Sequence, residues 1–166
     1  MTVSTNINSS FEIDIKKWQS LGLLDHNAIK DIANDPSVPL TSNERLYLGL
    51  LNAKELGSVS FEAKKTIFSI GEPISAGYFV VSGQLLAVND KGIQRLGPGS
   101  VIGLAEGLIG MHSDKRVITV TSVQVRVISL YKIDAIIPRL PIPVREMIKN
   151  MVKRVLDLKN LPSGVL

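Results

Sequence analysis

The chain is organised around one stretch, LGPGSVIGLAEGLIGMHSDKRVITV, which covers residues 96–120. Gly97, Gly99 and Gly103 interrupt it with turns, and the apolar run after Gly103 predicts one or two helical turns. A helix that starts at a glycine presents free backbone N–H groups, and the positive end of its dipole attracts anions. Arg116 follows on a predicted strand, placed to neutralise the same charge. The stretch therefore predicts a site for a small phosphate ester.

Short β-rich runs separated by turns surround this stretch, and they predict an all-β barrel or sandwich rather than alternating βαβ units. Asn89-Asp90-Lys91-Gly92 is a hairpin signal, because Asn, Asp and Gly tolerate positive φ. Gly83 similarly marks a bend between two strands. The expected strands lie near 58–61, 66–69, 78–82, 84–89, 93–96, 115–121 and 124–131. We expect a mainly β fold with flanking helices, similar to an eight-stranded jelly roll.

Four motifs follow one another in a set order and spacing: TIFSIGEP at 66–73, GYFVVSGQL at 77–85, LGPGSVIG at 96–103, and Arg116 with Val120 four residues later. Through them, the sequence from Val59 to about Leu158 resembles the cyclic nucleotide-binding domain of the catabolite-activator, protein-kinase regulatory-subunit and gated-channel superfamily. The resemblance implies a jelly-roll β-barrel whose ligand, cAMP or cGMP, is regulatory and not a catalytic cofactor.

Arg116 is the expected phosphate-binding residue. It alternates along its strand with Ile118 and Val120, so these side chains should share one face. If that face is the barrel interior, the guanidinium is buried and needs an anionic partner. By resemblance the partner is the exocyclic phosphate, and the structural alternative is an ion pair with Glu106 or Asp114. An exposed side chain at position 116 would instead favour a protein that binds no nucleotide.

The resemblance places the ligand against Gly103, Leu104, Ala105, Glu106, Arg116 and Val117. Two of these positions depart from the family pattern. Leu104 replaces the acidic residue that holds the ribose 2′-hydroxyl, so Glu106 is either a displaced ribose contact or an exposed helix residue. Val117 replaces a hydroxyl residue, which removes a hydrogen bond of about 0.5–1.5 kcal/mol and favours cAMP over cGMP. The glycines themselves are equally explained as turn residues.

Composition limits the classes of protein to which the chain can belong. Its 166 residues, 45% hydrophobic, suit one compact domain with an appendage, and the absence of cysteine excludes disulfides and thiolate sites. Apolar runs are far shorter than a membrane span, and residues 1–10 lack a basic-then-apolar signal, so we expect a cytoplasmic protein without membrane contact. The net charge is +4, and its excess gathers at 145–159, where a solvated helix face is a simpler explanation than a nucleic-acid patch lacking aromatics.

The expected organisation has four parts: an N-terminal helical appendage at 1–56, the β-barrel core at 57–132, C-terminal helices at 133–160 and a tail at 161–166. Ser9 with Glu12 and Thr41 with Glu44 are capping-box patterns in the appendage. A final helix from about Val144 to Lys159 carries a heptad pattern. The pattern consists of Val144, Ile148, Met151, Val155 and Leu158. The apolar face formed by these residues predicts either a plain core-facing helix or a lid that also forms a homodimer.

The leading functional hypothesis is a cyclic nucleotide sensor that transmits ligand occupancy through its C-terminal helix to an effector protein. No catalytic triad, paired carboxylates or Walker loop is present, and His26 and His112 lack a second histidine at ligand spacing, so neither catalysis nor a metal site is expected. One alternative is a ligand-blind barrel that serves as an interaction scaffold. Another is the sensing fragment of a transcription regulator. Only residues 161–166 follow the final helix, so direct DNA binding is not expected.

Overall fold

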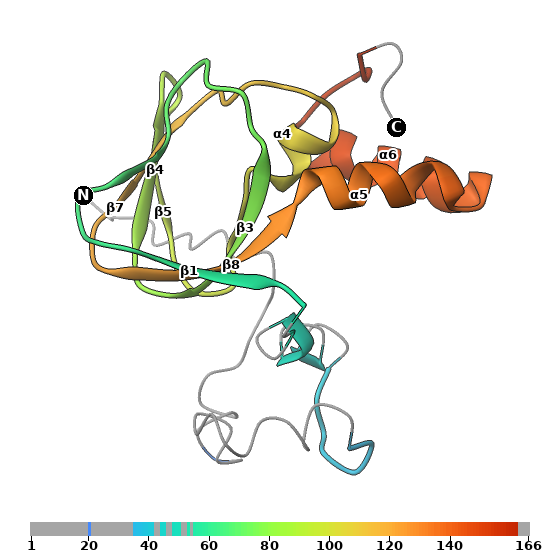
Figure 1. Ribbon diagram of the computed structural model, residues 1–166, viewed down its shortest axis with the longest axis horizontal. Coiled ribbons are helices and arrows are strands. Elements are labelled where there is room, and N and C mark those ends of the chain that lie inside the picture. The colour runs from blue at the N-terminus through green and yellow to red at the C-terminus, as the bar shows by residue number, and fades with distance from the viewer. Residues whose placement is uncertain are drawn as a thin grey trace.

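The computed structural model describes residue 20 and residues 35–41, 44–45, 48–50, 53 and 55–162. Within these residues, eight strands form two four-stranded antiparallel sheets that face each other as a β-roll (Figure 1). The strands are β1 (Gly57–Phe61), β2 (Thr66–Phe68), β3 (Ala76–Ser82), β4 (Leu85–Asn89), β5 (Gly92–Leu96), β6 (Val101–Ile102), β7 (Arg116–Thr119) and β8 (Val123–Ser129). The mainly β prediction with flanking helices is confirmed.

One sheet has the order β1-β8-β3-β6 and the other β2-β7-β4-β5, so most neighbours are distant in sequence. Seven of the eight strands were predicted to within a few residues. β6 was missed because two residues are too short to show alternation. The last predicted strand was too long by two residues, since Leu130 already begins a helix and is buried in it.

The predicted hairpin joins β4 to β5, with Asn89 paired to Gly92. Gly92 has a φ of 140°, and the Lys91 backbone N–H donates to the Asn89 side-chain oxygen at 3.1 Å. The bend at Gly83 is also confirmed, with a φ of 92°. Local turn chemistry was therefore sufficient to place both connections.

Inward-facing side chains from both sheets form the core. Its buried members are Phe68, Val80, Leu85, Ala87, Leu96, Ile102, Val117, Val123 and Val125. They alternate with outward-facing residues along each strand, as expected where one face of a sheet is buried. Tyr78 packs at the edge of this core, with its ring 5.6 Å from that of Phe68.

Helices gather at one end of the roll (Figure 1). They are α4 (Leu104–Leu108), α5 (Leu130–Ile136), the 3-10 helix η1 (Ile137–Arg139) and α6 (Ile142–Val155). β8 runs directly into α5, and Pro138 lies in the first turn of η1, where a missing N–H costs no hydrogen bond. The final helix was predicted from about Val144 to Lys159, but it starts two residues earlier and ends at Val155.

No helix among the described residues is long and apolar enough to cross a membrane. The N-terminal appendage lies largely outside the described residues, including the capping box of Ser9 and Glu12. The second capping box is confirmed. The Thr41 N–H donates to Glu44 Oε2 at 2.7 Å, and the Glu44 N–H donates to Thr41 Oγ1 at 3.2 Å.

The core and the surface of the second sheet should respond differently to truncation. Leu85 of β4 is fully buried, so Leu85→Ala should lower the free energy of unfolding by about 2–5 kcal/mol through lost burial and a residual cavity. Ile93 on the neighbouring strand is 70% exposed, so Ile93→Ala should change the free energy of unfolding by only about 0.5 kcal/mol. Urea denaturation measures both, and equal losses would contradict this core assignment.

Candidate ligand-binding site

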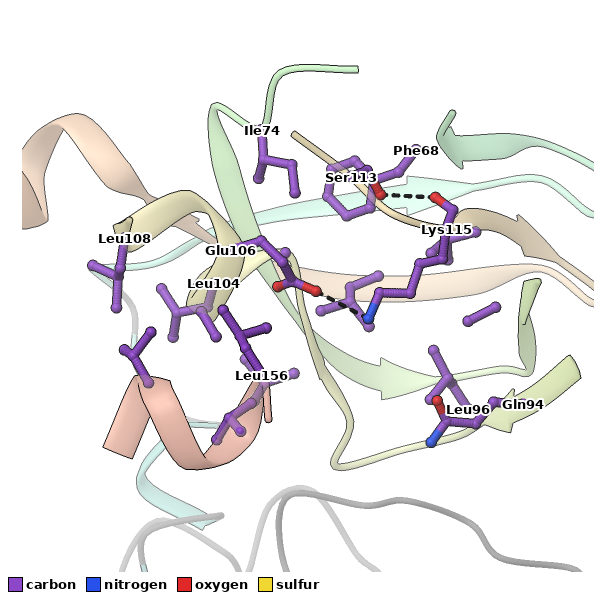
Figure 2. Close-up of a pocket in the computed structure, with 18 of the residues that line it drawn as sticks. Phe68, Ile74, Gln94, Leu96, Leu104, Glu106, Leu108, Ser113, Lys115 and Leu156 are labelled. Carbon is purple, nitrogen blue, oxygen red and sulfur yellow. Dashed lines mark hydrogen bonds and ion pairs between the residues drawn. The ribbon is translucent and has the colours of Figure 1, made fainter. Parts of the chain in front are cut away.

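A cavity of about 760 Å³ lies where the roll meets α4 and α6. Its size falls within the range of small-molecule sites. Phe68 of β2 and Leu96 of β5 line it from the roll, and Leu104 and Leu108 line it from α4 (Figure 2). A further part of the apolar wall comes from α6 and its C-cap: Ile148, Met151, Val152, Val155 and Leu156. Helix α6 therefore forms one side of the cavity.

The charged groups that line this cavity are one lysine and one glutamate. Lys115, just before β7, extends its ammonium toward Glu106 of α4, and Nζ lies 3.0 Å from Glu106 Oε1 (Figure 2). The Glu106 side chain is 7% exposed and that of Lys115 is 30% exposed. Asp114 adds a longer contact to Nζ at 3.7 Å. The cavity thus has apolar walls and one ion pair.

The backbone near Lys115 is held in place by its neighbour. Ser113 is buried, and its hydroxyl donates to the Lys115 carbonyl oxygen at 2.7 Å. The Ser113 backbone N–H donates to the Glu72 carbonyl at 2.9 Å, and its own carbonyl accepts from Gly71 at 2.8 Å. These bonds tie the segment before β7 to the turn after β2, so Lys115 enters the cavity from an ordered backbone.

The environment of Lys115 favours its charged form. Burial by itself lowers the pKa of Lys115, but the attraction of Glu106, aided by hydrogen bonding and by Asp114, outweighs it and raises the pKa above 10.5. The ammonium therefore stays charged at neutral pH. It is the cation that the cavity offers to an anionic ligand.

The predicted orientation of Arg116 is wrong. Arg116 is exposed and does not line the cavity, whereas Val117 is buried in the core. Val120, expected inside with it, is 48% exposed. The inward residues are therefore Val117 and Thr119, one position out of phase with the prediction. The alternative ion pair of Arg116 with Glu106 or Asp114 is also wrong: among the described residues, both carboxylates pair with Lys115.

Packing and hydrogen bonding explain this phase. Val117 contributes to the apolar core, and buried Thr119 donates its hydroxyl to the Glu62 carbonyl at 2.6 Å and accepts from the Lys65 N–H at 2.8 Å. The opposite phase would bury a guanidinium, which is costly without an anionic partner. The buried carboxylate of Glu106 already has a cation in Lys115.

The structure brings together the other five predicted site residues. Gly103, Leu104, Ala105, Glu106 and Val117 all line the cavity. Glu106 is not the exposed helix residue that was one of its two interpretations, since it is 6% exposed. Its other interpretation, a ribose contact, stays a prediction. So does phosphate binding at the start of α4, which is a helix of five residues.

Gly103 has a structural reason to be glycine. Its φ is 74°, and a Cβ there would lie 2.6 Å from Cζ of Phe68. Leu104, which follows it, packs against Gly77 of β3, where a Cβ would lie 2.9 Å from the Leu104 Cβ. The glycine that opens the predicted anion site is thus required by packing between α4 and the roll, whatever the cavity binds.

Sequence reasoning missed Lys115, whereas a lid role for the final helix was among its predictions. The signal for Lys115 was its place at the start of the strand predicted at 115–121, where alternation puts its side chain on the same face as that of Val117. The heptad positions Ile148, Met151 and Val155 did mark the face of α6 that lines the cavity. Among the described residues, no group of three acidic or histidine side chains could hold a metal ion, and His112 is exposed.

The fold and the cavity define a class of β-roll domains in which a short helix fills the mouth of the roll and a C-terminal helix closes a pocket against it. Residues 58–139 match the family model of the cyclic nucleotide-binding domain. A search of curated protein sequences finds no match.

Solved structures support the fold. One is the structure of EAL enzyme Bd1971 in its cAMP-bound form, which superposes with a TM-score of 0.52 at 19% sequence identity. The match covers 61% of this chain and 29% of the Bd1971 chain. The cGMP-bound form of Bd1971 superposes with a TM-score of 0.51 at 19% identity, and the match covers 60% of this chain and 28% of that chain. A third structure comes from a cyclic-GMP-dependent signalling pathway that regulates bacterial phytopathogenesis. It superposes with a TM-score of 0.53 at 19% identity, and the match covers 73% of this chain and 98% of that chain. The chain spans less than a third of the Bd1971 chains in these two forms.

Two glycines with nearly the same backbone conformation allow the packing at Gly103 to be measured. Gly71 has a φ of 78° and open space around it, whereas Gly103 has a φ of 74° and contacts Phe68. Gly71→Ala should cost about 1–2 kcal/mol from the left-handed conformation alone. Gly103→Ala should cost at least about 1 kcal/mol more, because the Phe68 ring must move. Equal losses in urea denaturation would show that Phe68 adapts without cost.

The ion pair predicts a dependence of stability on alkaline pH. Because the pKa of Lys115 is raised in the folded state, its contribution is complete below pH 10.5 and is lost as pH rises through the folded-state pKa. The stability difference between wild type and Lys115→Met should therefore shrink above about pH 10.5. Urea denaturation from pH 8 to about 11.5 measures it. A difference that stays constant over this range would contradict the assignment.

Proposed function

We propose that this chain binds a cyclic nucleotide, cAMP or cGMP, as a regulatory ligand in the cavity between the roll and α6. The observation that carries the proposal is the ammonium of Lys115, held in the cavity 3.0 Å from a buried carboxylate. Lys115 then takes the phosphate-binding role that the sequence had suggested for Arg116. The match to the family model of the cyclic nucleotide-binding domain and the cAMP- and cGMP-bound forms of Bd1971 support the choice of ligand.

The apolar walls suit the rest of such a ligand. A purine base buries a flat, largely apolar surface, and Leu96, Leu104 and Met151 offer apolar side chains around the cavity. A lysine contacts phosphate as a point charge, without the two parallel hydrogen bonds of an arginine. We therefore expect weaker phosphate binding than an inward arginine would give.

Transmission through the C-terminal helix is the second part of the proposal. Five residues of α6 and its C-cap line the cavity, so a bound ligand would contact this helix directly. A ligand can shift the position of α6 only if it binds one arrangement more tightly than the other. The contacts of Ile148 and Leu156 with the cavity are the type of differential contact that this mechanism needs.

A homodimer through the heptad face of α6 stays part of the proposal. Met151 and Val155 line the cavity, yet they are 58% and 72% exposed, so each has apolar surface left for a partner helix. Val144, Ile148 and Leu158 complete the predicted face. An effector protein would be controlled through the same helix.

A second candidate function is a ligand-blind scaffold, and specific observations favour it. Arg116 is exposed, Leu104 and Val117 replace two polar ligand contacts of the family, and Lys115 already has an anionic partner. In this case the roll would present its helices to a partner protein regardless of nucleotide. The third possibility, the sensing fragment of a transcription regulator, has no observation in its favour among the described residues.

Calorimetric titration with cAMP and cGMP tests the proposal. Lys115→Met should weaken binding by about ten- to hundredfold, the usual effect of losing a hydrogen bond to a charged group. Lys149→Met is the matched control: Lys149 also pairs with a glutamate at 3.0 Å and is 27% exposed, but it lies outside the cavity. This control should bind as the wild type does.

The same experiment separates the two functions. No saturable binding by the wild type at millimolar nucleotide would overturn the sensor and support the scaffold. Binding that Lys115→Met and Lys149→Met weaken equally would place the ligand elsewhere. Backbone hydrogen exchange of residues 142–155, with and without nucleotide, should report a change in α6 if occupancy is transmitted through it.

A further inference from the structure

The cavity contains its own anion. Its lining residues carry one positive group, Lys115, and one negative group, Glu106, which are paired at 3.0 Å. The other polar side chains that line it, Gln94 and Ser113, are uncharged. The pair is therefore neutral before any ligand enters. This inference rests on the proposed function, because it concerns how the same cavity admits a cyclic nucleotide.

A cyclic phosphodiester carries a single negative charge. If it approaches Lys115 while Glu106 stays ionised, two anions share one cation between apolar walls and the cavity gains a net negative charge. Like charges at this range repel strongly where the surroundings are poorly solvated. Phosphate binding thus competes with the bond that already holds Lys115.

Glu106 is poorly placed to move out of the way. Its side chain is 7% exposed, and α4 packs against β3, α5 and α6. Gly107, the next residue, is pressed against Leu130 and Ile74 so closely that a Cβ would collide with Leu130. Rotation of α4 to expose the carboxylate would disrupt this packing. The carboxylate therefore stays beside the phosphate when a ligand enters.

We propose that Glu106 is an internal competitor for the ligand phosphate: it occupies Lys115 in the empty cavity and lowers the affinity of the cavity for a cyclic nucleotide. This role is opposite to that of a ribose contact. A ribose acceptor strengthens binding and is harmed by neutralisation, whereas a competitor weakens binding and its neutralisation increases affinity.

The groups that surround Glu106 in the cavity show which charges a ligand phosphate would meet. The segment before β7 brings Lys115 and, farther out, Asp114, which is 56% exposed. The wall from α6 is Ile148, Met151, Val152, Val155 and Leu156, and β2 and β5 add Phe68, Gln94 and Leu96, none of them titratable. His112 in the same segment is exposed and lies outside the lining. Any effect of His112 or Asp114 on ligand binding persists when Glu106 is replaced.

The test is calorimetric titration of cAMP and cGMP on wild type and Glu106→Gln. Because the variant lacks the competing charge, it should bind at least about tenfold more tightly than the wild type. Glu146→Gln is the matched control, since Glu146 also pairs with a lysine at 3.0 Å but lies on α6 outside the cavity; it should behave as the wild type does.

The outcomes separate this inference from the proposed function. Equal or weaker binding by Glu106→Gln with its fold intact overturns the competitor role and leaves nucleotide binding standing. No binding by either protein overturns both. If Glu106→Gln does not fold, Glu106→Met, which removes the same charge, is titrated in its place.

Discussion

The ion pair between Lys115 and Glu106 is the interaction on which the arrangement of the cavity depends. A buried carboxylate needs a cation, and the one that reaches it comes from the residue directly before β7. This pairing joins α4 to the start of β7. It also places the only charged groups of the cavity lining at one point and leaves the rest of the wall apolar. The chemistry available to a ligand follows from that distribution.

The same pairing is consistent with the phase of β7. With Lys115 directed into the cavity, Val117 and Thr119 face inward, where one fills the core and the other bonds to the backbone of residues 62 and 65. Arg116 then faces solvent. A strand has two faces and a period of two, so a shift of one residue exchanges every inward and outward side chain. Arg116, the arginine on which the sequence prediction rested, therefore lies outside the cavity.

Sensor and scaffold differ in what the cavity does rather than in how the chain folds. The glycine at 103 and the core valine at 117 are accounted for by packing with Phe68 and its neighbours. The residues that remain unexplained by folding alone are Lys115 and Glu106, since a well-packed apolar pair is often as stable as a buried ion pair. Their retention of charge inside an apolar cavity is the strongest argument that the cavity has a charged ligand.

Local sequence determined the elements of this protein. Alternating apolar residues, the Asn89–Gly92 turn and the capping box of Thr41 and Glu44 each depend on neighbours within a few residues, so they could be predicted. Tertiary structure determined which face of β7 is buried, because hydropathy alone favours Ile118 with Val120, whereas the buried pair is Val117 with Thr119. It also determined the partner of Glu106 and the contact of α6 with the cavity. Those choices depend on which groups meet across the roll, and residues far apart in the sequence carry no local signal of that meeting.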